Sequence, residues 1–443
     1  MATKDVADFI FNVHVEDLPR EVITQVKLCT LDTLGAAIAG RNTRSVRIIV
    51  DLLRSMGGVK EATFIGFGLQ APLDRAILVN SAMSTALDSD DGCMSPVGHL
   101  GHIGGCVIPA ALAVAERENS TGEAFIEAVA AGYEVYLRTG WILTEPELKK
   151  FPLSGTSGTY GAAAAAGKLL NLAKEEIANA LGIAEAYAPV PKMGRIAKTG
   201  PMTKEAMSWG AMTGVTAALL ARKGFTGPTT IYDDFTYDRS HLDSLGNSYE
   251  MMKVYFKPYC ACRYTHAALD GMLNLIKEHG LFPDDISKIT VEGGSGAALL
   301  NANRPMTIEH AQYSFPFIIG VALVEGEVSP DQIKETRLCD KAILSQADKV
   351  EIVFSEAVDS LLPSCFGAIV TIETKNGRKY QAKRDFPKGE PEDPLSNKEI
   401  EEKFRRWATT VIDNERAQKI LNCIEDLDNM VSINELIEHV AYF

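Results

Sequence analysis

Residues 161–172 read Gly-Ala-Ala-Ala-Ala-Ala-Gly-Lys-Leu-Leu-Asn-Leu and contain five consecutive alanines. Alanine has the highest helix propensity, and its small side chain lets neighbouring helices approach closely. This stretch therefore predicts a helix in a tightly packed helical domain. Such packing needs no special chemistry, so the stretch indicates the fold and leaves the function open.

Helical patterns extend from this stretch in both directions. Residues 20–39 place apolar side chains at spacings of three and four, and Gly40 ends that pattern. A further helix is expected over 202–222. Residues 1–260 therefore predict a large all-helical domain, and amphipathic helices within 395–443 are expected to return to it and complete it.

The pattern changes near Phe256. Short segments that alternate between apolar and polar residues predict strands over 289–292, 349–354, 368–373 and 379–383. Asn376-Gly377 suits a two-residue type I′ hairpin turn, and helices are expected over 264–279 and 329–345. Residues 261–394 therefore predict a smaller α+β domain, and the fold class is mainly α with a smaller α+β domain.

The composition excludes several classes of partner. The chain has 443 residues, is 46% hydrophobic and carries a formal net charge of −14. Nucleic acid and anionic membranes are not expected partners, and an anionic substrate would need a local cationic pocket.

The eight cysteines are scattered, no secretory signal precedes them, and no window approaches 18 uninterrupted apolar residues. A reduced, cytoplasmic protein without a membrane span is expected.

The first candidate site lies within residues 84–110. Its ionisable residues are Asp88, Asp90, Asp91, His99 and His102. The acids end an apolar stretch, and the histidines lie in a glycine-rich loop that leads into another helix. Histidine gives or takes a proton near neutral pH, and the N–H groups at the start of the next helix favour an anion. The alternative is an acidic helix end followed by a solvent-exposed loop.

A metal site is a second alternative for the same segment. Asp90, Asp91, His99 and His102 offer ligand types that bind divalent ions. Their spacing matches no known metal motif. A metal-free site is therefore the primary prediction, and a metal-dependent lyase is its rival.

Positive charge gathers near the expected domain boundary, where Lys257, Arg263 and His266 lie close in sequence. Clefts between domains are common ligand sites. Arg263 has the geometry to hold a carboxylate in bidentate fashion, and Lys257 supplies a point charge; the alternative is a solvated basic hinge.

Lys204 is expected in the first turn of a helix, where its positive charge opposes the helix dipole. A lysine in this unfavourable position is a mild indication of function. The alternative is an ordinary lysine on the protein surface.

Residues 151–161 read Phe-Pro-Leu-Ser-Gly-Thr-Ser-Gly-Thr-Tyr-Gly and precede the alanine stretch. Their hydroxyls and glycines suit a loop that holds a carboxylate, with Ser157 among the donors, or else an ordinary helix entry. No Gly-x-Gly-x-x-Gly follows a strand and no Walker motif is present, so nucleotide binding is not indicated.

Nine segments resemble, in the same order, the MmgE/PrpD family, which includes 2-methylcitrate dehydratase, cis-aconitate decarboxylase and iminodisuccinate epimerase. The segments are Leu31–Gly40, Ala86–Asp91, His102–Gly105, Gly158–Ala166, Ala217–Pro228, Phe256–Tyr259, Arg263–His266, Ala311–Pro316 and Pro394–Phe404. Together they cover nearly the whole chain. The resemblance implies a helical domain built from both chain ends, an α+β lid domain, a homodimer, and a cofactor-free site between the domains.

The resemblance also implies roles for individual residues. The positions that match the family's pocket, and are the predicted catalytic groups, are Asp88, His102, Lys204 and Lys257. The predicted substrate-binding groups are Arg263, His266, Asp91 and Ser157. Histidines common before the alanine helix in the family appear here as Pro152 and Ser157, which favours an isomerase or epimerase of a substituted succinate.

The leading prediction is a cofactor-free lyase or isomerase that abstracts a proton next to a carboxylate of a small di- or tricarboxylate. The enolate that forms needs cations aimed at it, which Lys204, Lys257 and Arg263 would supply. His102 is the expected base or acid, and Asp88 would orient a pocket partner. A non-catalytic carboxylate-binding homologue is the remaining alternative.

Overall fold

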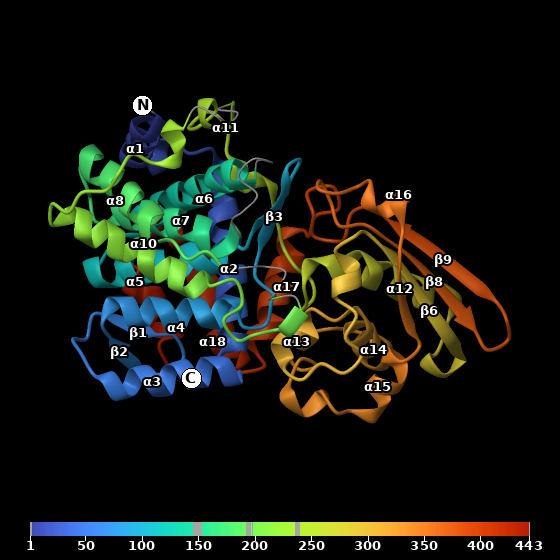
Figure 1. Ribbon diagram of the computed structural model, residues 1–443. Helices are drawn as coiled ribbons and strands as arrows, with labels where there is room; N and C mark the ends of the chain where they lie inside the picture. The colour runs from blue at the N-terminus through green and yellow to red at the C-terminus, as the bar shows by residue number, and fades with distance from the viewer. Residues whose placement is uncertain (1, 145–152, 192–195, 197, 235–239, 443) are drawn as a thin grey trace.

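The computed structural model describes residues 2–442 except 145–152, 192–195, 197 and 235–239. Two lobes lie side by side (Figure 1). The larger lobe is mainly helical and contains both chain ends, and the smaller lobe combines helices with a four-stranded sheet. The predicted fold class, mainly α with a smaller α+β domain, is confirmed.

The larger lobe takes its helices from the first part of the chain and from the C-terminus. They are α1 (Ala2–Asn12), α2 (Arg20–Gly40), α3 (Arg44–Met56), α4 (Leu73–Thr85), α5 (Gly104–Glu118), α6 (Gly122–Thr144), α7 (Leu153–Leu169), α8 (Lys174–Tyr187), α10 (Met207–Arg222), α11 (Ser240–Asp243), α17 (Asn397–Ala408), α18 (Asn414–Glu425) and α19 (Asn434–Val440). Helix α7 packs against α5, α6, α8 and α10.

Small residues allow α7 to lie very close to its neighbours. The alanines at 162–166 are all buried. A Cβ atom on Gly161 would lie 2.8 Å from the carbonyl oxygen of Gly132, and one on Gly214 would lie 2.2 Å from that of Thr159. Both distances are too short for any side chain, so glycine is required where α6 and α10 cross α7.

Of the two interpretations of 151–161, the ordinary helix entry is correct for residues 153–161 and the carboxylate-holding loop is wrong, because α7 already begins at Leu153. The glycines of this segment serve helix packing rather than anion binding. A Cβ atom on Gly155 would lie 2.5 Å from the carbonyl oxygen of Glu205, and one on Gly158 would lie 2.4 Å from Cys106 Sγ.

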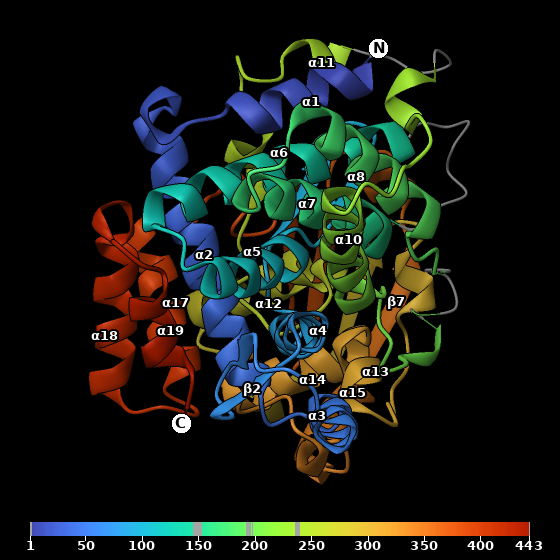
Figure 2. The same cartoon turned by 90° about the vertical axis from the view of Figure 1, so that its left-hand side faces the viewer.

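The C-terminal helices return to the larger lobe. Helices α17 and α18 pack against α2, and α19 packs against α18 (Figure 2). Ser396 caps α17, because its Oγ atom accepts a hydrogen bond from Glu399 N and its backbone N–H donates to Glu399 Oε2. This pair of hydrogen bonds is a capping box. Trp407 is completely buried.

Two small sheets, which the sequence did not indicate, belong to the larger lobe. Strands β1 (Ala62–Phe64) and β2 (Leu69–Ala71) form one hairpin. Strands β3 (Gly92–Ser95), β4 (Gly98–Gly101) and β5 (Val254–Tyr255) form a sheet of order β4-β3-β5. The expected glycine-rich loop is thus a β-hairpin. Its pairing with β5 brings the segment after α4 beside the segment that leads to Lys257.

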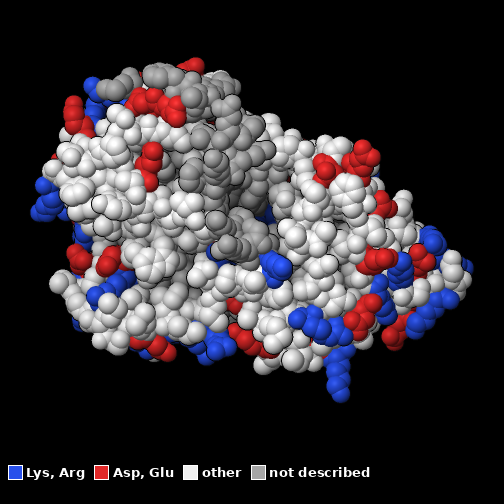
Figure 3. All heavy atoms as spheres, in the orientation of Figure 1, with Lys and Arg blue, Asp and Glu red and all other residues white. Residues whose placement is uncertain are grey.

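The smaller lobe is built on an antiparallel sheet with one parallel edge strand. Its strands are β6 (Ile286–Gly293), β7 (Val350–Phe354), β8 (Ala368–Thr374) and β9 (Lys379–Arg384), in the order β7-β6-β8-β9. Its helices are α12 (His266–His279), α13 (Ile308–Gln312), α14 (Phe315–Glu325), α15 (Lys341–Ala347) and α16 (Glu356–Asp359). Helix α12 packs on β8 and β9. Basic and acidic side chains are interspersed at the outer end of this lobe (Figure 3).

Two local predictions in this lobe are wrong. The β8–β9 loop is not a type I′ turn: Gly377 N donates to Thr374 O, and Gly377 has a φ of 83° whereas Asn376 does not have a positive φ. This is a three-residue loop, in which a type I turn is followed by a left-handed glycine. The helix expected over 329–345 is limited to a short turn at Glu335–Arg337 and to α15, because the side chain of Asp340 caps α15 at its start.

The two lobes have separate hydrophobic cores that meet at their junction. The core of the larger lobe takes side chains from Ala2 to Phe256 and from Ile400 to Val440. The core of the smaller lobe also includes four residues of the larger lobe, which are Ala39, Leu87, Ile196 and Trp407. Leu87 therefore places the turn after α4 at the junction of the lobes.

By length and composition, α2 is apolar enough to cross a membrane, but 78% of its apolar window is buried in the protein. It packs against α4 and α17. Burial of this kind is expected of a core helix in a large helical lobe.

Candidate active site

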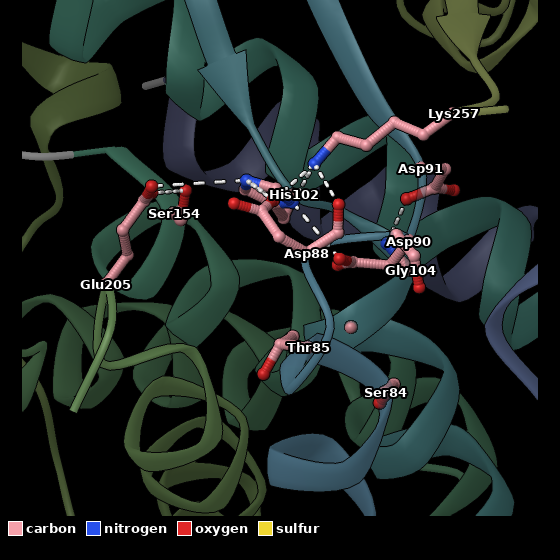
Figure 4. Close-up of polar contacts among 12 residues, drawn as sticks. Ser84, Thr85, Asp88, Asp90, Asp91, His102, Gly104, Ser154, Glu205 and Lys257 are labelled. Carbon is pink, nitrogen blue, oxygen red and sulfur yellow. Dashed lines mark hydrogen bonds and ion pairs between the residues drawn. The ribbon is translucent and has the colours of Figure 1, made fainter. Parts of the chain in front are cut away.

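The turn after α4 presents three buried carboxylates in different directions. Asp88 has a φ of 53°, which is uncommon for a residue with a side chain and is often found at functional sites. Asp88, Asp90 and Asp91 are each at most 2% exposed. The left-handed residue turns the chain so that Asp88 and Asp90 face His102, whereas Asp91 faces the start of α5 (Figure 4).

His102 lies between β4 and α5 and is the centre of the cluster. Its Nδ1 atom is 3.3 Å from Asp90 Oδ1 and 3.4 Å from Lys257 Nζ. Its Nε2 atom is 3.7 Å from Asp88 Oδ1. Burial of the ring and the Lys257 ammonium lower the pKa of His102, but the carboxylates of Asp90 and Asp88 raise it more, so the net pKa is above its ordinary value.

Lys257 follows β5, on the segment that crosses to the smaller lobe. Its buried Nζ atom donates to Asp88 Oδ1 at 2.5 Å and to the Asp88 carbonyl at 3.2 Å. Burial favours the neutral form of Asp88, but Lys257, Lys204 and His102 outweigh it and hold the pKa of Asp88 far below its usual range. Burial likewise lowers the pKa of Lys257, but Asp88 and Asp90 raise it above its ordinary value. Both side chains are therefore charged.

Lys204 joins this cluster from a turn and not, as predicted, from the first turn of a helix, because α10 begins at Met207. Its φ is 44°. Its Nζ atom donates to Thr85 O and to Gln312 Oε1, both at 2.8 Å, and lies 3.9 Å from Asp88 Oδ2. Gln312 belongs to the smaller lobe, so the two lobes meet at this lysine.

Glu205 and Ser154 complete the cluster, and the sequence reasoning missed both. Glu205 Oε1 is 4.0 Å from His102 Nε2, and Glu205 Oε2 accepts a hydrogen bond from Ser154 Oγ. Figure 4 shows the two side chains together on one side of His102. Two signals could have found them: the position of Glu205 next to Lys204, and the hydroxyl-rich segment that contains Ser154.

Asp91 lies behind the cluster and not in it. Its carboxylate accepts hydrogen bonds from Gly104 N at 2.7 Å and from Tyr133 OH at 2.6 Å. Burial, followed by the charge of Asp32, raises the pKa of Asp91 to about 7.

Lys403 of α17 donates to Asp32 Oδ1 at 2.5 Å and to the Ser89 carbonyl at 2.8 Å. A cation of the C-terminal helices therefore holds the turn that carries Asp88 and Asp90.

Three predicted substrate-binding residues lie outside the cluster. The Arg263 guanidinium is bonded to Glu390, His266 and the carbonyl of Lys388. This arginine is therefore committed to holding the segment that returns from the smaller lobe, and the ring nitrogens of His266 contact Arg263 and the Ala261 carbonyl. Ser157 is buried in α7, and its Oγ atom has no hydrogen-bond partner among the described residues. Pro152 lies outside the described residues.

The proposed metal-ligand set of Asp90, Asp91, His99 and His102 does not converge. Asp91 faces Gly104, and His99 Nε2 lies 2.8 Å from Tyr255 OH. In the described part of the chain, Asp88, Asp90 and His102 do bring one ligand atom each within 4.8 Å of the others. Lys257 already places an ammonium group against two of these residues, so a metal ion there would meet a like charge.

The arrangement provides one imidazole that can transfer a proton, two ammonium groups that can face an anion, and carboxylates that orient them. Asp88, His102, Lys204 and Lys257 were all predicted as catalytic groups, and the structure brings these four together within the contacts given above. Lys or Arg atoms are also visible in the hollow between the two lobes (Figure 3).

Comparison with known proteins agrees with this arrangement. The MmgE/PrpD N-terminal domain matches residues 4–236, and the MmgE/PrpD C-terminal domain matches residues 259–429. The chain is 26% identical to a human cis-aconitate decarboxylase, over 97% of this chain and 92% of the relative. It is 24% identical to a cis-aconitate decarboxylase of Aspergillus terreus, over 98% and 95%. It is also 24% identical to the cis-aconitate decarboxylase-like protein oryM of Aspergillus oryzae, over 99% and 97%. Because family domains match almost the whole chain, this protein belongs to the MmgE/PrpD family of enzymes.

Proposed function

We propose that the protein is a lyase that acts on a small di- or tricarboxylate and transfers a proton at a carbon next to a carboxylate. One observation carries the proposal: the buried imidazole of His102 lies between Asp90 and Asp88 and beside Lys257. Its raised pKa favours the protonated form near neutral pH, so His102 begins the reaction as a proton donor.

The chemistry follows from the charges around His102. A carbanion next to a carboxylate is stabilised when cations face the oxygens of the enolate that forms, and Lys204 and Lys257 supply this charge. In a decarboxylation, the C–C bond to one carboxylate breaks, CO₂ leaves, and the electron pair moves toward the remaining carboxylate. His102 then protonates the carbon and regains its proton from solvent. In a dehydration, a carboxylate of the cluster takes the proton from the carbon next to the substrate carboxylate, the electron pair of that C–H bond forms the C=C bond, and the same imidazolium protonates the hydroxyl, which leaves as water.

The relatives favour a lyase over the isomerase that the sequence suggested. The human and Aspergillus terreus relatives are cis-aconitate decarboxylases, and they match nearly the whole chain. An isomerase is the second candidate, because a proton returned to the opposite face of the same carbon would use the same groups. Neither reaction as written needs a metal ion, since the two lysines provide the positive charge.

The test is proton NMR in deuterated buffer with cis-aconitate, citrate, 2-methylcitrate and malate as separate substrates. We expect either loss of CO₂ with deuterium at a carbon next to a remaining carboxylate, or loss of water. His102→Gln should lower the rate by at least about 100-fold, whereas His279→Gln, an exposed histidine at the end of α12, should leave it unchanged. Exchange without a net product would favour the isomerase.

Binding without any turnover or exchange would instead identify a non-catalytic homologue. That outcome would appear as ligand-dependent thermal stabilisation by these acids. Neither binding nor turnover with any of them would overturn the proposal.

A further inference from the structure

Glu205 occupies a position that is held by two strained neighbours. Lys204 has a φ of 44° and Ala206 a φ of 58°, and left-handed conformations at residues with side chains persist where the surrounding structure enforces them. The backbone is confined as well, because a Cβ atom on Gly155 would lie 2.5 Å from the Glu205 carbonyl oxygen. This turn directs two adjacent side chains, Lys204 and Glu205, into the same cluster.

The carboxylate of Glu205 is available on one oxygen. Oε2 accepts a hydrogen bond from Ser154 Oγ, and Oε1 is 4.0 Å from His102 Nε2, which is too long for a hydrogen bond. Among the described residues, His102 is the one cation within ion-pair distance of Glu205. The residue is only 5% exposed. A carboxylate oxygen without a close donor keeps its capacity to accept a hydrogen bond, and a donor group of a ligand can use it.

The charges around His102 restrict what this donor can be. The carboxylates of Asp88, Asp90 and Glu205 face the cations His102, Lys204 and Lys257. A substrate carboxylate next to Glu205 would place two like charges on one shared cation. A hydroxyl or amino group in the same place would donate to Oε1 instead.

We propose that Glu205, held by Ser154, is the acceptor for a hydroxyl or amino group of the substrate, which is therefore a hydroxy- or amino-substituted polycarboxylate. Glu205 acts here as a specificity-determining residue. The inference rests on the proposed function, since it names the substrate class of the same site. It also separates this protein from one whose substrate has no donor, such as cis-aconitate.

The test compares matched ligands by isothermal titration calorimetry on the full-length protein. Citrate is paired with tricarballylate, and malate and aspartate are each paired with succinate, so that members of a pair differ in the donor group. We expect wild-type protein to bind the donor-bearing member of at least one pair on the order of tenfold more tightly. Glu205→Leu should bring that ratio close to one, and Glu205→Gln, which keeps an acceptor oxygen, should give an intermediate ratio.

Ser154→Ala should weaken the same preference, because it frees the carboxylate that Ser154 orients. Thr159→Val is the control on the same helix, since the Thr159 hydroxyl bonds to the Gly155 carbonyl within α7; its ratio should match the wild type. Circular dichroism verifies that each variant is folded. If both members of every pair bind and Glu205→Leu leaves the ratio of their affinities unchanged, this inference is wrong and the proposed function still stands. Failure of every ligand to bind overturns this inference, and if cis-aconitate and 2-methylcitrate also neither bind nor react, it overturns the proposed function as well.

Discussion

Replacing Asp91 by asparagine should remove a large pH dependence of folding stability. The Asp91 carboxyl is completely buried, and burial, followed by the charge of Asp32, raises its pKa from 3.8 to about 7. Asparagine has the same shape, and its oxygen can still accept the hydrogen bond from Gly104 N. The substitution therefore removes the titration while leaving the packing behind the cluster intact.

The direction of the effect follows from proton uptake. Between about pH 4 and pH 7 the folded protein keeps a proton on Asp91 that the unfolded chain has lost, so protonation favours the folded state at the acidic end. This contribution disappears as the pH rises through 7. Each pH unit corresponds to about 1.4 kcal/mol. From pH 5 to pH 8, this single group should lower the free energy of unfolding by about 3 kcal/mol.

Urea unfolding at pH 5 and pH 8, followed by circular dichroism and tryptophan fluorescence, measures this change. The free-energy difference between Asp91→Asn and wild type should shift by about 3 kcal/mol in favour of the variant at pH 8. Asp51→Asn, at an exposed position of α3, should leave the wild-type pH dependence in place. If the Asp91→Asn and wild-type curves run parallel between the two pH values, Asp91 does not titrate in this range and our account of the buried acids is wrong.

Three further predictions concern the cluster and the helical core. The pH–rate profile of the substrate found by NMR should fall as the pH rises through the raised pKa of His102, because the imidazolium is the proton donor; a rate that instead increases through neutral pH would make His102 a base. Lys257→Met should cost about 3–5 kcal/mol in urea unfolding by leaving Asp88 buried without its partner, and adding Asp88→Asn should recover most of that loss, so strictly additive costs would contradict the pairing. Gly161→Ala should destabilise by about 1–3 kcal/mol, whereas Gly167→Ala on the same helix, where the nearest atom to a Cβ would be 3.6 Å away, should stabilise by about 0.5–1 kcal/mol; the reverse order in thermal melts would refute the packing argument.

Periodic segments were predicted well from the sequence. The pattern at 20–39 forms α2, and the alternating segments at 289–292 and 368–373 lie within β6 and β8. Hydrophobic periodicity reports local structure directly, so these elements needed no knowledge of the rest of the chain. The strands at 92–101 were missed because glycine weakens the strand signal and because β3 pairs with β5, more than 150 residues away.

In the candidate site, too, residues with a recognisable local signal were predicted, whereas residues whose role depends on distant or unusual structure were not. Asp88, His102, Lys204 and Lys257 were identified by family resemblance and by their chemistry, and their contacts place them together. Arg263 was assigned to the substrate because its position near the domain boundary is visible in sequence, whereas its partner Glu390 lies 127 residues away. Glu205 was missed although it lies next to Lys204, because the direction of its side chain depends on left-handed conformations at both neighbours. No local propensity predicts these conformations.

The hydrogen bonds from Lys403 have a consequence for protein synthesis. Lys403 is made 371 residues after Asp32 and 314 residues after Ser89, and chains emerge from the ribosome N-terminus first. Until α17 has emerged and docked, the acidic turn lacks the ammonium group that holds it. The cluster is therefore assembled only after α17 has been synthesised and has docked, and a truncated product that stops before α17 should have no activity even where its early helices have folded.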